Sequence, residues 1–124
     1  MARIFVLEED RSMREMLKEV LEKKGYKGRV FSTPGELFFG LSRGLRPNLI
    51  ISNFFGLEEM DGLEVIRRLK KRSGFREIPV ILITMFAGFP EFQEEAREAG
   101  AEMVLPKPFS IRKQLLPAIA ELVI

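Results

Sequence analysis

Short apolar runs alternate with longer amphipathic stretches along the whole chain. Five runs have the length of strands, and their consecutive apolar residues are typical of strands buried on both faces of a sheet. They cover residues 3–7, 29–31, 49–51, 80–83 and 102–105, and the third and fourth lead directly into Ser52-Asn53 and Thr84. Because a helical pattern follows each run, the sequence predicts five strand–helix units.

The amphipathic stretches carry recognisable helix ends. N-terminal signals are Asp10, or Ser12 with Glu15, for the first helix, then Thr33-Pro34, Asp61, Pro90 and Ser110 for the others. The first four helices are expected to stop near Gly25, Gly44, Gly74 and Gly100. In the last helix, Pro117 lacks the N–H that would bond the preceding turn, so a bend near Lys113 is expected.

This alternation favours a parallel sheet, because neighbouring parallel strands need crossover connections and these are usually helices. The predicted fold is a doubly wound α/β sandwich with helices on both faces of the sheet. A length of 124 residues with 46% hydrophobic content suits a single domain over residues 1–124.

Composition removes several function classes. The chain has no cysteine and no histidine, which excludes disulfides and thiolate zinc sites and removes the commonest general base. Its 20 basic and 18 acidic residues are interleaved, so nucleic-acid binding is not indicated. The sequence has neither a membrane-spanning apolar run nor a secretory signal, and a cytoplasmic protein is expected.

Polar residues stand where four of the predicted strands end. Glu8 and Glu9 follow the first strand, Asn53 the third, Thr84 the fourth and Lys107 the fifth. An isolated Asn after a strand usually starts a turn. In an open parallel sheet, however, the carboxyl ends of the strands line the crevice where ligands bind. The pattern therefore indicates one site that combines these side chains.

Five segments carry a resemblance to a known family. They read VLEEDRSMREML, NLIISN, MDGLEVIRRLK, IPVILIT and GAEMVLPKPF. In this order they resemble the response-regulator receiver domain of two-component signalling, over essentially the whole chain. The resemblance implies a flavodoxin-like (βα)5 fold with strand order 2-1-3-4-5, and a place in a phosphorelay.

The resemblance also implies a role for each strand-end residue. Glu8 and Glu9 match the acidic pair that helps to hold Mg²⁺, and Asn53 stands where the family has the aspartate that accepts a phosphoryl group. Thr84 and Lys107 match the groups that contact the phosphoryl oxygens, and the bond from Lys107 to Pro108 is expected to be cis. Val104 stands at the position of the switch aromatic residue.

The departures from the family pattern argue for lost phosphorylation. The Asn53 amide has no anionic oxygen to attack phosphorus, and it removes one carboxylate from the metal site. Ser52 should point to the other face of the strand, and Val104 has no ring to move. The segment between Asn53 and Gly62 is also one residue longer than usual. We therefore expect a non-enzymatic pseudo-receiver without a cofactor, which acts by binding a protein such as a kinase, an output protein or itself.

An alternative stays open: a Mg²⁺-dependent switch that uses another acceptor residue, with the metal on Glu8 and Glu9. Asn53 discriminates between the two hypotheses. The chain could be a single-domain regulator or a piece of a longer protein.

Four phenylalanines fall in the loops beside the predicted site. Phe54 and Phe55 follow the third strand, and Phe86 and Phe89 come after the fourth. At least one is expected to cover the core, since aromatic side chains bury large apolar areas. Those that stay exposed would form a protein-docking surface at the strand ends.

Overall fold

The computed structural model describes residues 2–123, and Met1 and Ile124, the ends of the expected domain, lie outside them. The strands are β1 (Arg3–Leu7), β2 (Lys27–Phe31), β3 (Leu49–Asn53), β4 (Val80–Thr84) and β5 (Met103–Pro106). The helices are α1 (Arg11–Lys23), α2 (Pro34–Ser42), α3 (Gly62–Lys70), α4 (Pro90–Ala99), the π-helical turn η1 (Ile111–Leu115) and α5 (Leu116–Leu122).

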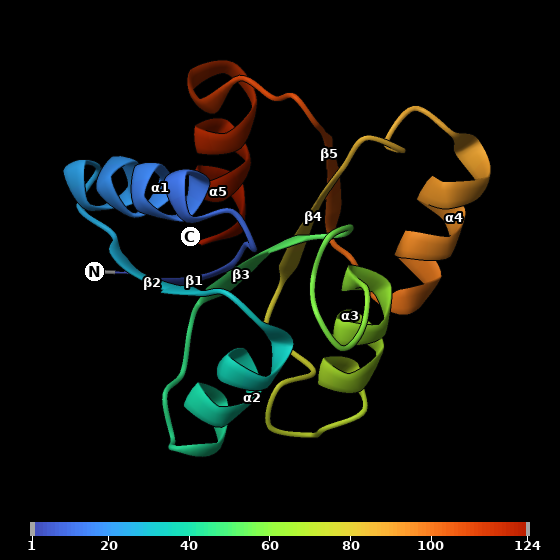
Figure 1. The fold of residues 1–124 in the computed structure, drawn as a ribbon, viewed down its shortest axis with the longest axis horizontal. Coiled ribbons are helices and arrows are strands. Elements are labelled where there is room, and N and C mark those ends of the chain that lie inside the picture. Colours follow the sequence, from blue (N-terminus) through green and yellow to red (C-terminus); the bar gives the residue numbers. More distant parts are fainter. Residues whose placement is uncertain (1, 124) are drawn as a thin grey trace.

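All strand pairs are parallel, and the sheet order is β2-β1-β3-β4-β5. Helices α1 and α5 cover one face of the sheet, and α2, α3 and α4 cover the other (Figure 1). The doubly wound, flavodoxin-like fold with order 2-1-3-4-5 is therefore confirmed.

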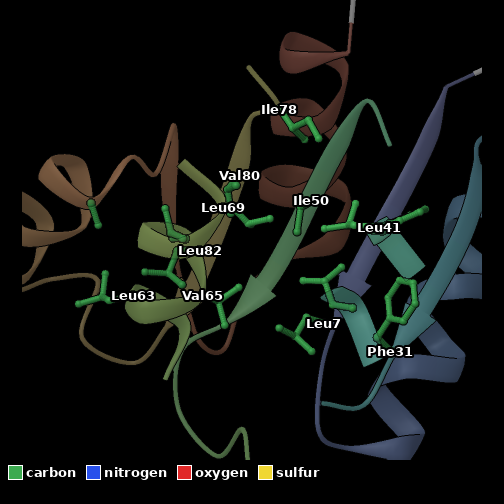
Figure 2. Close-up of a cluster of buried hydrophobic side chains, with 14 of the residues drawn as sticks. Leu7, Phe31, Leu41, Ile50, Leu63, Val65, Leu69, Ile78, Val80 and Leu82 are labelled. Atoms are coloured by element: carbon green, nitrogen blue, oxygen red, sulfur yellow. The ribbon is translucent and has the colours of Figure 1, made fainter. Parts of the chain in front are cut away.

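Each face of the sheet has its own hydrophobic core. Side chains of one strand alternate between the two, so Ile50 packs toward α2 and α3 while Ile51 packs toward α1 and α5. Figure 2 shows the first core, in which Leu7, Ile50 and Leu82 of adjacent strands meet side chains of the covering helices. The central strands β3 and β4 are buried along their full length, which explains their continuous apolar runs.

The helix starts follow the local capping signals. Asp10, and not Ser12, caps α1: its carboxylate accepts a hydrogen bond from the Met13 N–H at 2.8 Å. The side chains of Thr33, Asp61 and Ser110 accept equivalent bonds from the third residue that follows each of them.

The predicted end of the third helix at Gly74 was wrong. Helix α3 ends at Lys70, whose ammonium donates to the carbonyl oxygens of Arg76 and Ile78. The Arg76 guanidinium in turn donates to the Lys70 carbonyl. These contacts fold the chain back directly after Lys70 and stop the helix one turn early.

The strand limits differ less from the prediction. Strand β2 begins at Lys27, two residues before the apolar run, because it is an edge strand whose charged side chains face solvent. Strand β5 covers Met103–Pro106, one residue later than expected.

The disturbance expected from Pro117 takes the form of a π-helical turn. The Leu115 N–H bonds to the Ser110 carbonyl at 3.0 Å, a spacing of five residues, and the Leu116 N–H bonds to Ile111 in the same way. Pro117 follows in the first turn of α5, where a missing N–H disrupts least. The wide turn replaces a simple kink in one continuous α-helix.

Candidate functional site

The carboxyl ends of the central strands bring the predicted site residues together. Glu8 directly follows β1, Asn53 and Thr84 end β3 and β4, and Lys107 directly follows β5. The side chains of Glu8, Glu9, Asn53 and Lys107 form one connected set of contacts. Asn53 is at its centre and is only 4% exposed.

The Asn53 amide has a defined orientation. Its Nδ2 group donates to Glu9 Oε1 at 2.6 Å and to the Phe55 carbonyl at 2.9 Å. On the other side, its Oδ1 faces Lys107 Nζ at 3.4 Å. Two acceptors on one side and an ammonium on the other permit only this orientation of the amide. Asn53 thus joins the acidic pair, the following loop and the lysine.

Lys107 is held between two acceptors. Its Nζ lies 3.6 Å from Oε1 of the nearly buried Glu8 side chain, with which it forms an ion pair when Glu8 is ionised, and the same ammonium reaches Asn53. The Lys107 N–H also bonds to the Thr84 carbonyl at 3.1 Å, which extends the β4–β5 pairing. The bond from Lys107 to Pro108 is cis, as the resemblance implied.

The two acidic residues have opposite titration behaviour. Burial, together with a hydrogen bond to Glu9, raises the pKa of Glu8 from its ordinary 4.5 to about 7, against the opposing effects of the Asp10 N–H and Lys107. Burial also acts to raise the pKa of Glu9, but hydrogen bonds from Glu8, from its own backbone and from Asn53 outweigh it. The pKa of Glu9 is therefore lowered. Near neutral pH the pair shares a proton, with Glu9 as the carboxylate.

Arg14 supports the acidic pair from α1, a role that sequence reasoning missed. Its guanidinium donates to the carbonyl oxygens of Glu8 and Glu9 at 3.0 and 2.9 Å. The Asp10 N–H donates to Glu8 Oε2 at 3.0 Å. Arg14 lies in the first turns of α1, five residues after Glu9, and this short separation was the only sequence signal for the contact.

Three other predicted residues lie beside this network. Thr84 is buried, and its hydroxyl oxygen accepts the Phe86 N–H at 3.1 Å, so it orders the loop after β4. Ser52 donates to the carbonyl oxygen of Asn53 at 2.9 Å, inside the strand end. Val104 is half-buried against the core on the α2–α3–α4 side of the sheet.

The loop between β3 and α3 is tied down at two points. Gly56, with φ of +86°, lies against Glu9: an added Cβ would come within 2.7 Å of Glu9 Oε2. Glu59, the one residue other than glycine with positive φ among residues 2–123, accepts the Gly35 N–H at 2.9 Å at the start of α2. The longer loop is therefore ordered by contacts with both the site and its neighbouring helix.

These side chains do not fit a magnesium ion as they are arranged here. Mg²⁺ requires oxygen ligands in near-octahedral geometry. The Nδ2 group of Asn53 is a donor and cannot ligate a cation, and it already occupies Glu9 Oε1 and the Phe55 carbonyl oxygen. Within residues 2–123 the acidic side chains form no group of three that suits a metal.

We therefore predict that millimolar Mg²⁺ leaves the melting temperature of the protein unchanged, because a ligand stabilises a protein only by binding its native state. Thermal unfolding followed by circular dichroism, with Na⁺ at matched ionic strength as the control, tests this. A rise in melting temperature that occurs with Mg²⁺ but not with Na⁺ would show that the cation can displace the Asn53 amide from Glu9 and Phe55.

The four phenylalanines divide into two kinds. Phe54 and Phe86 are half-buried, whereas Phe55 is 71% exposed and Phe89 is 58% exposed. A fifth ring, Phe92 of α4, packs edge-on against Phe54 with ring centroids 4.8 Å apart. Sequence reasoning missed Phe92, although it stands three residues after Phe89 at the start of a helix.

The chain is thus a doubly wound, flavodoxin-like α/β domain with an acidic pair, an amide, a hydroxyl and a lysine at the carboxyl ends of its strands. The sequence model of the response regulator receiver domain matches residues 4–120. The chain belongs to this family, as a receiver domain of two-component signalling.

Individual relatives agree with this assignment. The polar-differentiation response regulator DivK of Brucella anthropi is 32% identical over 108 residues, covering 87% of this chain and 85% of the relative. The signal receiver domain of a Syntrophus aciditrophicus histidine kinase is 32% identical, with a TM-score of 0.88 and coverage of 99% and 90%. Vibrio cholerae CheY4, 24% identical with a TM-score of 0.87 and 98% coverage of both chains, shares the fold. None of the helices within residues 2–123 combines the length and the apolar composition of a membrane span.

Proposed function

We propose that this receiver domain works without phosphorylation and regulates by binding a protein partner. The observation that carries the proposal is the Asn53 amide, which donates to both Glu9 and the Phe55 carbonyl. An amide at this position provides no nucleophilic oxygen, and its N–H₂ group is a donor that cannot ligate a cation. The chain keeps the fold and the lysine of the family while the reactive centre is closed by internal bonds.

The rival function is a phospho-switch with a different acceptor. The hydroxyls at the ends of β3 and β4 are those of Ser52 and Thr84, and both already form hydrogen bonds within the strand ends and the β4–α4 loop. Glu9 is an anionic oxygen nucleophile in principle, but it is paired with Asn53 and Glu8. These contacts favour the phosphorylation-independent function.

Intact-mass spectrometry after incubation with a small phosphodonor and Mg²⁺ tests the proposal. We predict no phosphoryl adduct on the wild-type protein, because no carboxylate stands at position 53. The Asn53→Asp variant is the matched control, because it shows whether the phosphodonor can phosphorylate this fold when a carboxylate stands at position 53. A stoichiometric adduct on the wild-type chain, mapped by peptide sequencing to another residue, would establish the rival function instead.

A further inference from the structure

The large exposed apolar side chains are unevenly distributed. Five are found in residues 2–123: Met16 (38% exposed), Phe39 (63%), Phe55 (71%), Met85 (65%) and Phe89 (58%). Three of them lie in the loops that follow β3 and β4, beside the closed centre. Apolar residues gathered in this way mark an interaction surface more often than scattered ones do.

These loops border a groove between α3 and α4. Its apolar lining is Phe54, Leu63, Phe86, Phe89 and Phe92, and its volume is about 410 Å³. The rings support one another: Phe86 lies between Phe54, Phe89 and Phe92, with centroid distances of 5.9, 6.0 and 5.8 Å. We call this feature the aromatic groove. An aromatic side chain entering it would meet ring edges on several sides, which is the geometry of a binding hot spot.

The rim of the aromatic groove is acidic, although the chain as a whole has a net charge of +2. Asp61, Glu91 and Glu95 line it, together with Arg67. Arg67 is paired with Glu95 at 3.4 Å and with Glu64 at 3.9 Å, so its charge is compensated. Asp61 and Glu91 are left to attract a basic group at the groove.

Both acids have a local structural use. Asp61 caps α3, and Glu91 lies in the first turn of α4, where an acidic side chain complements the helix dipole. That use accounts for the two carboxylates. It does not account for Phe89, a groove ring that is 58% exposed although contact of apolar surface with water is unfavourable.

The chain itself carries a complementary feature. Phe39, in the last turn of α2, is exposed, and the Arg43 guanidinium lies 5.6 Å from the centre of its ring. This pair presents an aromatic ring with a positive charge directly beside it. An aromatic groove with the carboxylates of Asp61 and Glu91 on its rim complements this pair in apolar character and in charge.

We propose that the aromatic groove binds a second copy of this chain, with Phe39 entering the groove and Arg43 facing Asp61 and Glu91. Helix α2 ends just before β3 begins, whereas the groove lies where β3 and β4 end. Helix α2 covers the same face of the sheet as α3 and α4, the two helices that border the groove (Figure 1). Two copies placed antiparallel across this side make the contact twice, which closes a twofold dimer. The proposal deepens the interaction part of the proposed function and does not depend on the chemistry of Asn53.

Sedimentation velocity over a wide concentration range tests the dimer. The wild-type protein should pass from monomer to dimer, and Phe39→Ser and Phe89→Ser should each raise the dimer dissociation constant at least about tenfold. Arg43→Glu and Glu91→Arg should each weaken the dimer, and the two changes in one chain should restore much of the loss. These side chains are exposed, so circular dichroism should show folded variants throughout.

Met16→Ser is the matched control, since Met16 is an exposed apolar residue of α1 on the other face of the sheet. It should leave the dissociation constant unchanged. A wild-type protein that stays monomeric, a dimer insensitive to Phe39→Ser and Phe89→Ser, or charge reversals that do not rescue each other would each overturn the proposal. None of these results bears on whether the protein is phosphorylated, which intact-mass spectrometry tests separately.

Discussion

An Asn53→Asp variant should accept a phosphoryl group and respond to Mg²⁺, and it should be less stable than the wild-type protein without metal. In the wild-type protein, the amide nitrogen donates to Glu9 and to the Phe55 carbonyl. An aspartate cannot donate to either acceptor. The substitution therefore leaves two acceptors unpaired and places a third acidic side chain beside Glu8 and Glu9.

The expected loss of stability without metal is about 2–3 kcal/mol, from the two lost hydrogen bonds and the like-charge repulsion, partly offset by Lys107. Urea unfolding in the presence of a chelator measures it. Added Mg²⁺ should then raise the stability of the variant, because three acidic side chains provide the oxygens that the amide lacked. Intact mass after treatment with a phosphodonor should show the adduct, and peptide mapping should place it at residue 53.

Two control variants separate the causes. Asn53→Ala removes the donor without adding charge, so it should lose stability but gain no response to Mg²⁺. Glu9→Gln combined with Asn53→Asp removes Glu9, the ionised member of the acidic pair, and should recover part of the stability. If Asn53→Asp unfolds like the wild-type protein and ignores Mg²⁺, the longer loop at residues 54–60, and not the amide, blocks the site.

The features that could be predicted from sequence are those set by neighbouring residues. Asp61 needs only the N–H three residues later to cap α3, so a local signal is sufficient. The apolar runs of β3 and β4 report burial on both faces, and alternation with helices then leaves few possible topologies. The site residues followed from the same reasoning, since position at a strand end is a property of the order of elements.

The features that were missed depend on contacts beyond one helical turn or on side-chain orientation. Helix α3 ends at Lys70 because the chain folds back and Arg76 and Ile78 bond to Lys70. No residue pattern at Lys70 predicts these contacts. The convergence of Glu8 and Lys107 was expected, but the orientation of the Asn53 amide requires both partners in place at once. The aromatic groove required the packing of α3 against α4, so Phe92 could not be assigned to it from its spacing alone.

The stability of the protein should fall as the pH rises toward 7, and Glu8→Gln should abolish this dependence. The pKa of Glu8 is about 7 in the folded protein and 4.5 ordinarily, so between these values the folded state binds a proton that the unfolded chain has lost. Stability rises with pH only where the unfolded state binds more protons, and here the sign is reversed. A difference of about 2.5 pKa units corresponds to about 3 kcal/mol, which is an upper limit to the loss.

Glu9 does not mask this effect. Its pKa is lowered in the folded state, so its stabilisation is complete above the ordinary value of 4.5 and is lost only as the pH falls further. The window between 4.5 and 7 therefore reports mainly on Glu8. Urea unfolding with a chelator, at about pH 5 and about pH 8, measures the change.

Gln at position 8 imitates the protonated acid, since its carbonyl can still accept the Asp10 N–H and its amide can donate to Glu9. Glu8→Gln should therefore match the wild-type protein near pH 5 and exceed its stability near pH 8 by up to about 3 kcal/mol, a limit that already includes the pairing of ionised Glu8 with Lys107. Glu36→Gln is a control for which the opposite change in stability is expected. The pKa of Glu36 is lowered, mainly by the Ser32 backbone N–H, so this variant should lose stability above pH 4.5. A wild-type profile that is flat over the window would mean that Glu8 is already ionised in the folded protein near pH 5. A Glu8→Gln variant that is less stable at both ends would mean that the pairing of Glu8 with Lys107 outweighs its burial.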